Sequence, residues 1–360
     1  MLTVSLCMIV KNEEDVIGRC LDSVKDIFDE IIVVDTGSTD RTKEIVRQYT
    51  DLLYEFEWID DFSAARNYSF SKATKDYIMW LDADDIILPE DKKALLKLKQ
   101  TLDPAVTLVM MKYNVAFDTA GNPTYSYYRE RLFKRSMNYQ WKDPVHEAIT
   151  PHGNIIYRQI AISHKKLNQK DPQRNLRIYE KLLSQNVILS PRQQFYYARE
   201  LYYQKRYEES IKTFTNFLDS DKGWVENCID ACKDLSECYA VIGKEKKAIH
   251  SLLRSMEYGP PRAEICCELG RRFMLKKDYS TAIFWYTQAT SCKPNNTNGG
   301  FILPDCYNYL PYIQMCVCYD KLGDWKTAYM YNEKAAESKP EDKSVLINRE
   351  YFKQLRQNMS

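Results

Sequence analysis

Short apolar segments alternate with amphipathic ones in the first part of the chain, and this alternation constrains the fold more than any other feature. The segments with the length and apolar content of buried strands are residues 3–10, 30–35, 52–58 and 76–82. The segments with helical character lie between them, at residues 13–24, 36–50 and 63–74. This order predicts an α/β domain, in which a mostly parallel sheet carries helices on both faces.

Beyond residue 170 the periodicity is helical only, and one phrase recurs: KRYEESIKTF, KEKKAIHSLL, KDYSTAIFWY and GDWKTAYMYN. Its equivalent residues, Ser210, Ala248, Ala282 and Ala328, are 38, 34 and 46 positions apart. A helix-turn-helix period of about 34 residues is typical of tetratricopeptide repeats. The longest interval contains PNNTNGGFILP, a turn-rich segment that predicts a loop. We therefore divide the chain into a domain of residues 1–170 and an all-α repeat domain of residues 171–360.

Composition excludes few classes of protein. The 51 basic and 50 acidic residues nearly cancel, so bulk charge does not favour a nucleic-acid partner or an anionic membrane surface. No segment has the ~18 consecutive apolar residues of a membrane span, and the first residues resemble a strand rather than a signal peptide. The eleven cysteines lack the paired CxxC spacing of a zinc site. We expect reduced, buried thiols in a cytoplasmic protein.

Three carboxylates, Asp82, Asp84 and Asp85, directly follow the apolar strand segment YIMWL. Like charges this close repel each other and resist burial. Two carboxylates at positions i and i+2 can hold a hard divalent cation, which removes that repulsion and in turn binds a diphosphate. Because ligands bind beyond the carboxyl ends of parallel strands, we expect residues 11–14 and 35–38 to converge on the same crevice. Acidic pairs also cap turns, which is the simpler interpretation.

Four motifs occur here in the order and spacing of family 2 glycosyltransferases of the Rossmann-like GT-A fold: SLCMIVKNEEDVIGRCLDSV, DEIIVVDTGSTDRT, DFSAARN and YIMWLDADD. The resemblance covers about residues 1–170. RLFKR, VHE and ISH then resemble the later motifs of a subgroup that joins this domain to helical repeats. That subgroup includes the peptide S-glycosyltransferases of sublancin-type bacteriocins.

The resemblance implies a nucleotide-sugar site at six positions: Val10, Asn12, Glu13, Asp35, Arg66 and Asp82. An acidic side chain beside the base can accept the uracil N3–H, which favours a UDP-sugar donor. Thr36 stands where the common family pattern has a second acid, so the choice of base stays open. The resemblance places Arg66 near the nucleotide or diphosphate, where its planar donor fork suits either.

The resemblance further implies a metal site and a catalytic base. Asp84 is the direct metal ligand, His164 is a further ligand, and Asp82 faces the ribose or the metal. Oxygen ligands with one histidine accept either Mn²⁺ or Mg²⁺ as the divalent cofactor. Glu147 is the catalytic base that deprotonates the acceptor in an inverting transfer.

Each of these residues has a structural alternative. Glu147 can form a salt bridge with Lys142 or Arg131, His164 can be an ordinary hydrogen-bonded residue, and Asp35 can cap the helix that follows it. The remaining expectations are structural: Asp85 caps the next segment, Asp60 and Asp61 cap the SAARN helix, His152 lies in a turn, and Arg129, Arg131 and Arg135 reach a phosphate or form a solvated face.

The favoured function is an inverting, metal-dependent transfer of a sugar from a nucleotide-diphosphate donor to a Ser, Thr or Cys side chain of a peptide or protein. One alternative is the same chemistry on a glycan, a lipid-linked acceptor or another small acceptor. An alternative of another class is an inactive transferase domain on a repeat scaffold. The repeats would bind the acceptor or a second copy of the chain, and the sequence leaves that choice open.

Overall fold

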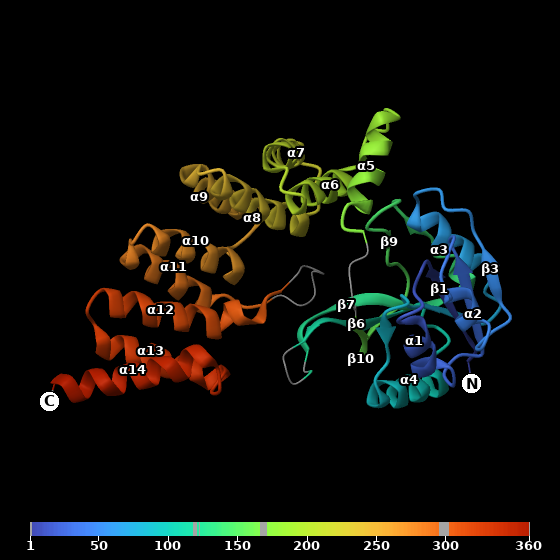
Figure 1. The fold of residues 1–360 in the computed structure, drawn as a ribbon, viewed down its shortest axis with the longest axis horizontal. Coiled ribbons are helices and arrows are strands. Elements are labelled where there is room, and N and C mark those ends of the chain that lie inside the picture. Colours follow the sequence, from blue (N-terminus) through green and yellow to red (C-terminus); the bar gives the residue numbers. More distant parts are fainter. Residues whose placement is uncertain (1, 118–120, 122, 166–170, 295–301, 360) are drawn as a thin grey trace. The chain divides into compact units, whose positions relative to one another are not determined.

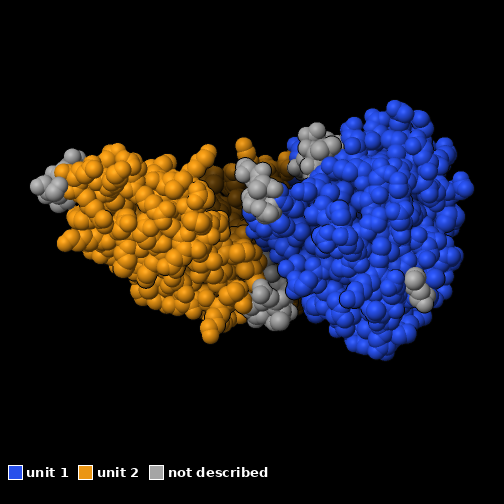
Figure 2. Space-filling model, turned by 90° about the horizontal axis from the view of Figure 1, so that it is seen from below, with its two compact units in different colours: residues 1–187 blue, residues 188–360 orange. Residues whose placement is uncertain are grey.

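The computed structural model describes residues 2–117, 121, 123–165, 171–294 and 302–359. The chain forms two compact units, residues 1–187 and 188–360 (Figure 1, Figure 2). The expected boundary at residue 170 falls outside the described residues, as does most of the expected loop at 294–304. The observed division comes later than the expected one.

The first unit contains an eight-stranded sheet with the order β3-β2-β1-β4-β7-β6-β10-β5. Its strands are β1 (Val4–Val10), β2 (Glu30–Asp35), β3 (Leu53–Glu55), β4 (Tyr77–Trp80), β5 (Asp85–Ile86), β6 (Leu108–Phe117), β7 (Pro123–Lys134) and β10 (Ile155–His164). The strands β3, β2, β1 and β4 are parallel, as predicted, whereas β7 is antiparallel to both β4 and β6. Two short strands, β8 (Trp141–Lys142) and β9 (Ala148–Ile149), pair separately.

Helices cover both faces of this sheet, which confirms the predicted α/β class (Figure 1). The helices of the unit are α1 (Ile17–Val24), α2 (Thr42–Val46), α3 (Phe62–Ser71), α4 (Pro89–Thr101) and α5 (Arg174–Ser184). Successive side chains of a strand point to opposite faces. Leu6 therefore packs in one core with α1 and α4, while its neighbour Cys7 packs in another with Phe70 of α3.

The helix predicted for residues 36–50 is shorter than expected, because α2 begins only at Thr42. The Asp35 carboxylate accepts hydrogen bonds from the backbone N–H groups of Gly37 and Ser38, and Gly37 has a φ of +100°. These bonds hold the start of the segment as a turn instead of a helix. The expected cap of α3 is confirmed for Asp61, whose Oδ1 accepts a hydrogen bond from the N–H of Ala64 at 2.9 Å.

Helix α5 belongs to the first unit rather than to the repeats, which explains the later division. Its Tyr179 is fully buried, and the hydroxyl donates a hydrogen bond to the Val145 carbonyl at 3.5 Å. The guanidinium of Arg174 lies 4.5 Å from the ring centre of Phe62 at the start of α3. The helical periodicity of α5 resembles that of a repeat helix, and tertiary contacts such as these assign it to the sheet domain.

The second unit consists of helices packed in pairs. Its helices are α6 (Pro191–Tyr203), α7 (Tyr207–Asp219), α8 (Val225–Val241), α9 (Glu245–Arg254), α10 (Ala263–Leu275), α11 (Tyr279–Ser291), α12 (Tyr309–Lys321), α13 (Trp325–Ser338) and α14 (Lys343–Met359). The equivalent residues of the recurring phrase lie on α7, α9, α11 and α13, and all four are fully buried: Ser210, Ala248, Ala282 and Ala328. Small side chains here allow close approach of the paired helix, as the 2.8 Å hydrogen bond from Ser210 Oγ to the Ala198 carbonyl shows. The unit is therefore a tetratricopeptide-like repeat domain.

The cysteines act as small core residues. All eleven are free thiols and ten are buried, which confirms this expectation. Among the helices that the structure describes, none is long and apolar enough to cross a bilayer.

Gly270 on α10 provides a test of how tightly a repeat pair is packed. A Cβ atom at this position would lie 2.8 Å from the ring of Tyr286 on α11, which is itself only 1% exposed. We expect Gly270→Ala to lower the urea midpoint of unfolding, because overpacking costs about 1–3 kcal/mol, more than alanine gains in helix propensity. The exposed control Lys246→Ala should leave the midpoint, followed by far-UV circular dichroism, almost unchanged. An unchanged or raised midpoint for Gly270→Ala would show that the pair has room to adjust.

Candidate functional site

The loops after β1 and β2 are hydrogen-bonded to each other, as expected for strands that end at one crevice. Asn12 donates its N–H to Ser38 Oγ at 2.9 Å, and its own Oδ1 accepts a bond from the N–H of Thr39 at 2.8 Å. The N–H of Glu13 donates to Thr42 Oγ1 at 2.7 Å. Asn12 has a φ of +55°, a left-handed conformation that asparagine tolerates better than most residues. The predicted nucleotide residues of the two loops therefore form one rigid rim.

Asp35 ends β2 and holds the turn that follows; it does not cap α2, which begins only at Thr42. It is paired with Val10 in the sheet and is only 1% exposed. Its Oδ1 accepts the two turn hydrogen bonds from Gly37 and Ser38, whereas its Oδ2 is buried and has no partner among the described residues. A buried acceptor without a partner costs about 1–3 kcal/mol, so Oδ2 is suited to receive a donor group from a ligand. Thr36 donates its hydroxyl to the Val10 carbonyl at 3.1 Å.

Arg66 joins two carboxylates that are distant in sequence. Its Nη2 donates to Asp82 Oδ1 at 2.7 Å and its Nε donates to Glu147 Oε1 at 2.6 Å. Burial alone would raise the pKa of Asp82, but the charge and hydrogen bond of Arg66 outweigh it and hold the pKa below its usual value. The structural alternative for Glu147 was a salt bridge with Lys142 or Arg131. The observed partner of Glu147 is Arg66 instead.

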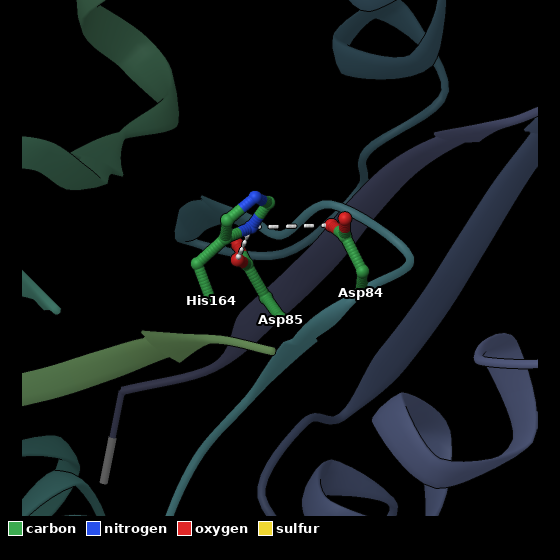
Figure 3. Close-up of side chains that lie close together, drawn as sticks. All are labelled: Asp84, Asp85 and His164. Atoms are coloured by element: carbon green, nitrogen blue, oxygen red, sulfur yellow. Dashed lines mark hydrogen bonds and ion pairs between the residues drawn. The ribbon is translucent and has the colours of Figure 1, made fainter. Parts of the chain in front are cut away.

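Asp84, Asp85 and His164 form the one group among the described residues with the spacing of a metal site (Figure 3). The Nδ1 atom of His164 lies 3.3 Å from Oδ1 of Asp84 and 3.3 Å from Oδ1 of Asp85. Sheet pairing creates this proximity, because His164 lies opposite Asp85 in the antiparallel pair of β10 and β5. Asp84 and His164 are together as expected, whereas Asp82 lies outside the group and bonds Arg66 instead.

The carboxylates of Asp84 and Asp85 favour the protonated, positively charged form of His164. Burial would lower the pKa of its imidazole, but the hydrogen bonds and charges of Asp84 and Asp85 outweigh that cost and raise the pKa to about 10. The group is therefore partly neutralised by an imidazolium proton. A divalent cation would do the same with more charge and would leave the imidazole neutral as a ligand.

Asp85 is the most buried residue of the group, and its role is more than the expected cap. It accepts hydrogen bonds from the Tyr113 hydroxyl at 2.9 Å and from the Asp82 N–H at 3.1 Å. It also pairs with Nη1 of Arg131 at 3.3 Å, and both side chains are 0% exposed. The Arg131 guanidinium lies between two rings, 3.8 Å from the centre of Trp80 and 4.4 Å from that of Tyr113. The expectation of a solvated or phosphate-binding face is therefore wrong for Arg131, because the indole and the phenol enclose it.

Sequence reasoning missed Tyr113 completely. Its hydroxyl lies 2.9 Å from Nδ1 of His164, so it contacts the histidine as well as Asp85. Nothing in the apolar strand around it marks this position. The other histidine considered for this region, His152, is exposed, and its Nδ1 lies 3.1 Å from the Thr150 carbonyl, consistent with a turn.

Parts of the chain are similar to known proteins. Residues 5–164 match the family described as glycosyl transferase family 2. The chain is 42% identical over 149 residues to a TPR repeat-containing protein of Synechococcus elongatus, covering 41% of this chain and 36% of that protein. It is 30% identical over 233 residues to the SPbeta prophage-derived glycosyltransferase SunS of Bacillus subtilis, covering 61% of this chain and 54% of that protein.

A third similar protein is the lipopolysaccharide core biosynthesis glycosyltransferase LpsC of Rhizobium meliloti. It is 26% identical over 161 residues, which cover 43% of this chain and 59% of that protein. The chain thus spans between 36% and 59% of the length of these three relatives.

Proposed function

We propose that this chain, a family 2 glycosyltransferase domain followed by tetratricopeptide-like repeats, is a metal-dependent inverting glycosyltransferase that uses a nucleotide-diphosphate sugar. The observation that carries the proposal is the group of Asp84, Asp85 and His164 at the end of β4. It lies beside the ion pairs that link Asp82, Arg66 and Glu147. This reaction needs one acidic group that binds a cation and another that accepts a proton.

The donor set fits a hard or borderline divalent cation. Two carboxylates and one imidazole within 4.8 Å of one another offer oxygen and nitrogen ligands, which suit Mn²⁺ and Mg²⁺. Asp84 and His164 are the proposed ligands, since their side chains are 21% and 25% exposed, whereas Asp85 is enclosed by Tyr113 and Arg131. The cation would bind the diphosphate and stabilise the negative charge that develops on it.

The protein's own residues carry the remaining steps. The loops with Val10, Asn12, Glu13 and Asp35 would hold the nucleotide, with the unpartnered Oδ2 of Asp35 accepting the uracil N3–H of a UDP-sugar. The acceptor oxygen or sulfur forms a bond to the anomeric carbon as the bond to the diphosphate breaks. Its proton passes to the Glu147 carboxylate, which acts as the general base.

The proposed acceptor is a Ser, Thr or Cys side chain of a peptide or protein. The fused repeats support this choice, because helical repeats form extended surfaces that suit a polypeptide. A glycan or another small acceptor is the second candidate, and an acceptor screen with both classes separates them.

Calorimetry of UDP binding with and without Mn²⁺ tests the proposal. UDP should bind the wild-type chain only with Mn²⁺, and Asp84→Ala should weaken that binding by about tenfold or more, because one anionic ligand is lost. The matched control is Asp51→Ala, which removes an exposed carboxylate and should leave UDP binding unchanged. GDP is tested in parallel, and its affinity relative to UDP shows which nucleobase the site selects. The absence of nucleotide binding under every condition would contradict the proposal and favour a repeat scaffold.

A further inference from the structure

We propose that Arg66 acts on sugar transfer as a positioning residue that holds Glu147, and not as a ligand of the donor diphosphate. This inference rests on the proposed function, because Glu147 is the general base only if the chain transfers sugar. It changes the role that the sequence resemblance implies for Arg66.

Two nitrogens of the Arg66 guanidinium, Nε and Nη2, already donate to carboxylates. Arg66 uses Nε for Glu147 at 2.6 Å and Nη2 for Asp82 at 2.7 Å. The side chains of Arg66 and Glu147 are only 9% and 13% exposed. A diphosphate that contacted Nε or Nη2 of Arg66 would have to displace a carboxylate in a site that is mostly closed to solvent.

Two indoles, those of Trp80 and Trp141, restrict the orientation of the guanidinium. Its Cζ lies 4.8 Å from the ring centre of Trp80 and 4.9 Å from that of Trp141. The two indoles are themselves packed edge to face, with centres 5.1 Å apart. Cation–π contact on two sides restricts the arginine to the orientation in which its fork faces both carboxylates.

The side chain of Glu147 is also held by a residue from a distant part of the chain. Glu147 lies in irregular backbone between β8 and β9, and two nearby residues, Asp143 and His146, have φ values of +74° and +54°. A carboxylate on such a loop is not positioned by secondary structure. Its ion pair with Arg66 on α3 connects it to the end of β4 through Asp82.

Arg66→Lys separates the two roles. A lysine keeps the charge but has no fork, so it cannot hold Asp82 and Glu147 in the same geometry. We expect UDP-sugar hydrolysis, with water as the acceptor, to fall in kcat by about 10²-fold, as for a small misplacement of a catalytic group. The Kd for UDP with Mn²⁺ should change by no more than about threefold, since loss of a direct charged hydrogen bond would raise it by about tenfold or more.

A double-mutant cycle with Glu147→Gln shows whether Arg66 acts through Glu147. Positioning predicts that the double variant is no slower than the slower single variant, because the same step is removed twice. A direct role on the diphosphate predicts that the two losses multiply. Arg158→Lys, which makes the same change at an exposed position of β10, is the control and should retain wild-type kcat.

The outcomes distinguish this inference from the proposed function. A wild-type chain that neither binds UDP nor hydrolyses any UDP-sugar overturns the proposed function. An active wild type with weakened UDP binding in Arg66→Lys and multiplicative losses overturns only the positioning role. If Arg66→Lys does not fold, Trp141→Phe removes one indole wall, and its Nε1 has no partner to lose among the described residues. The Trp141→Phe variant should show a smaller fall in kcat than that expected for Arg66→Lys, and its affinity for UDP should be unchanged. A weakened affinity for UDP would again contradict the inference.

Discussion

Glu147→Gln should lower the rate of sugar transfer by about 10²- to 10⁴-fold, the usual contribution of a general base. The amide keeps the size of the side chain and can still accept a hydrogen bond from Arg66 Nε, now 2.6 Å from Glu147 Oε1, so the local geometry is conserved. Only the capacity to take the acceptor proton is lost. Steady-state kinetics with a UDP-sugar and an acceptor peptide, together with UDP binding measured by calorimetry, would check this result.

The size of the loss also reports on the acceptor. A hydroxyl needs a base at neutral pH, whereas a thiol with a pKa near ~8.5 is already partly ionised. A loss well below about 10²-fold, with UDP binding intact, would therefore favour a thiol acceptor. Glu90→Gln removes an exposed carboxylate in the first turn of α4 and is the matched control. Equal rates for Glu147→Gln and wild type on hydroxyl acceptors would contradict the assignment of Glu147.

Arg131→Met should destabilise the first unit by about 3 kcal/mol, because the buried carboxylate of Asp85 loses one of its two cationic partners and keeps only His164. Both side chains are 0% exposed and are joined at 3.3 Å. Two other nitrogens of Arg131, Nε and Nη2, are buried without a partner among the described residues. Their removal offsets part of the loss, which places the expected effect at the lower end of the range for broken buried pairs, about 3–5 kcal/mol.

Hydrogen exchange of peptides from β4 and β7 measures this effect in the first unit without interference from the repeats. The double variant Arg131→Met with Asp85→Asn should recover part of the stability, because no unpaired charge then remains. Asparagine still accepts hydrogen bonds, so the contacts with Tyr113 and the Asp82 backbone are kept. If the single variant were as stable as wild type, the ion pair would not be a stabilising element of the site.

The elements of the fold were largely predictable because each has a local signal. The apolar runs of β1, β2 and β4 and the small residues Ser210 and Ala248 occur at positions that periodicity alone identifies. Two helices, α2 and α5, differ from the prediction, and specific contacts explain each difference. The turn bonds of Asp35 shorten α2, and the contacts of α5 with the sheet domain assign it to the first unit.

The sequence identified most residues of the candidate site, but not which of them contact each other. Asp84 and His164 come together as the family resemblance implied. The partner of Glu147 was not predictable, because Arg66 lies 81 positions away on another element. Tyr113 carried no signal and Arg131 was expected in another role, since the role of each depends on which neighbours enclose it.

The sequence by itself determined the two kinds of domain, the convergence of the segments after β1 and β2, and the residue types of the candidate site. Hydrophobic periodicity and turn chemistry are local properties, so they can be read without the fold. Only the tertiary structure decided that Asp82 pairs with Arg66, that Asp85 joins Asp84 and His164, and that two indoles restrict the guanidinium. Such pairings depend on the register between strands that are distant in the chain, and on the low exposure that makes one ionic partner much more favourable than another.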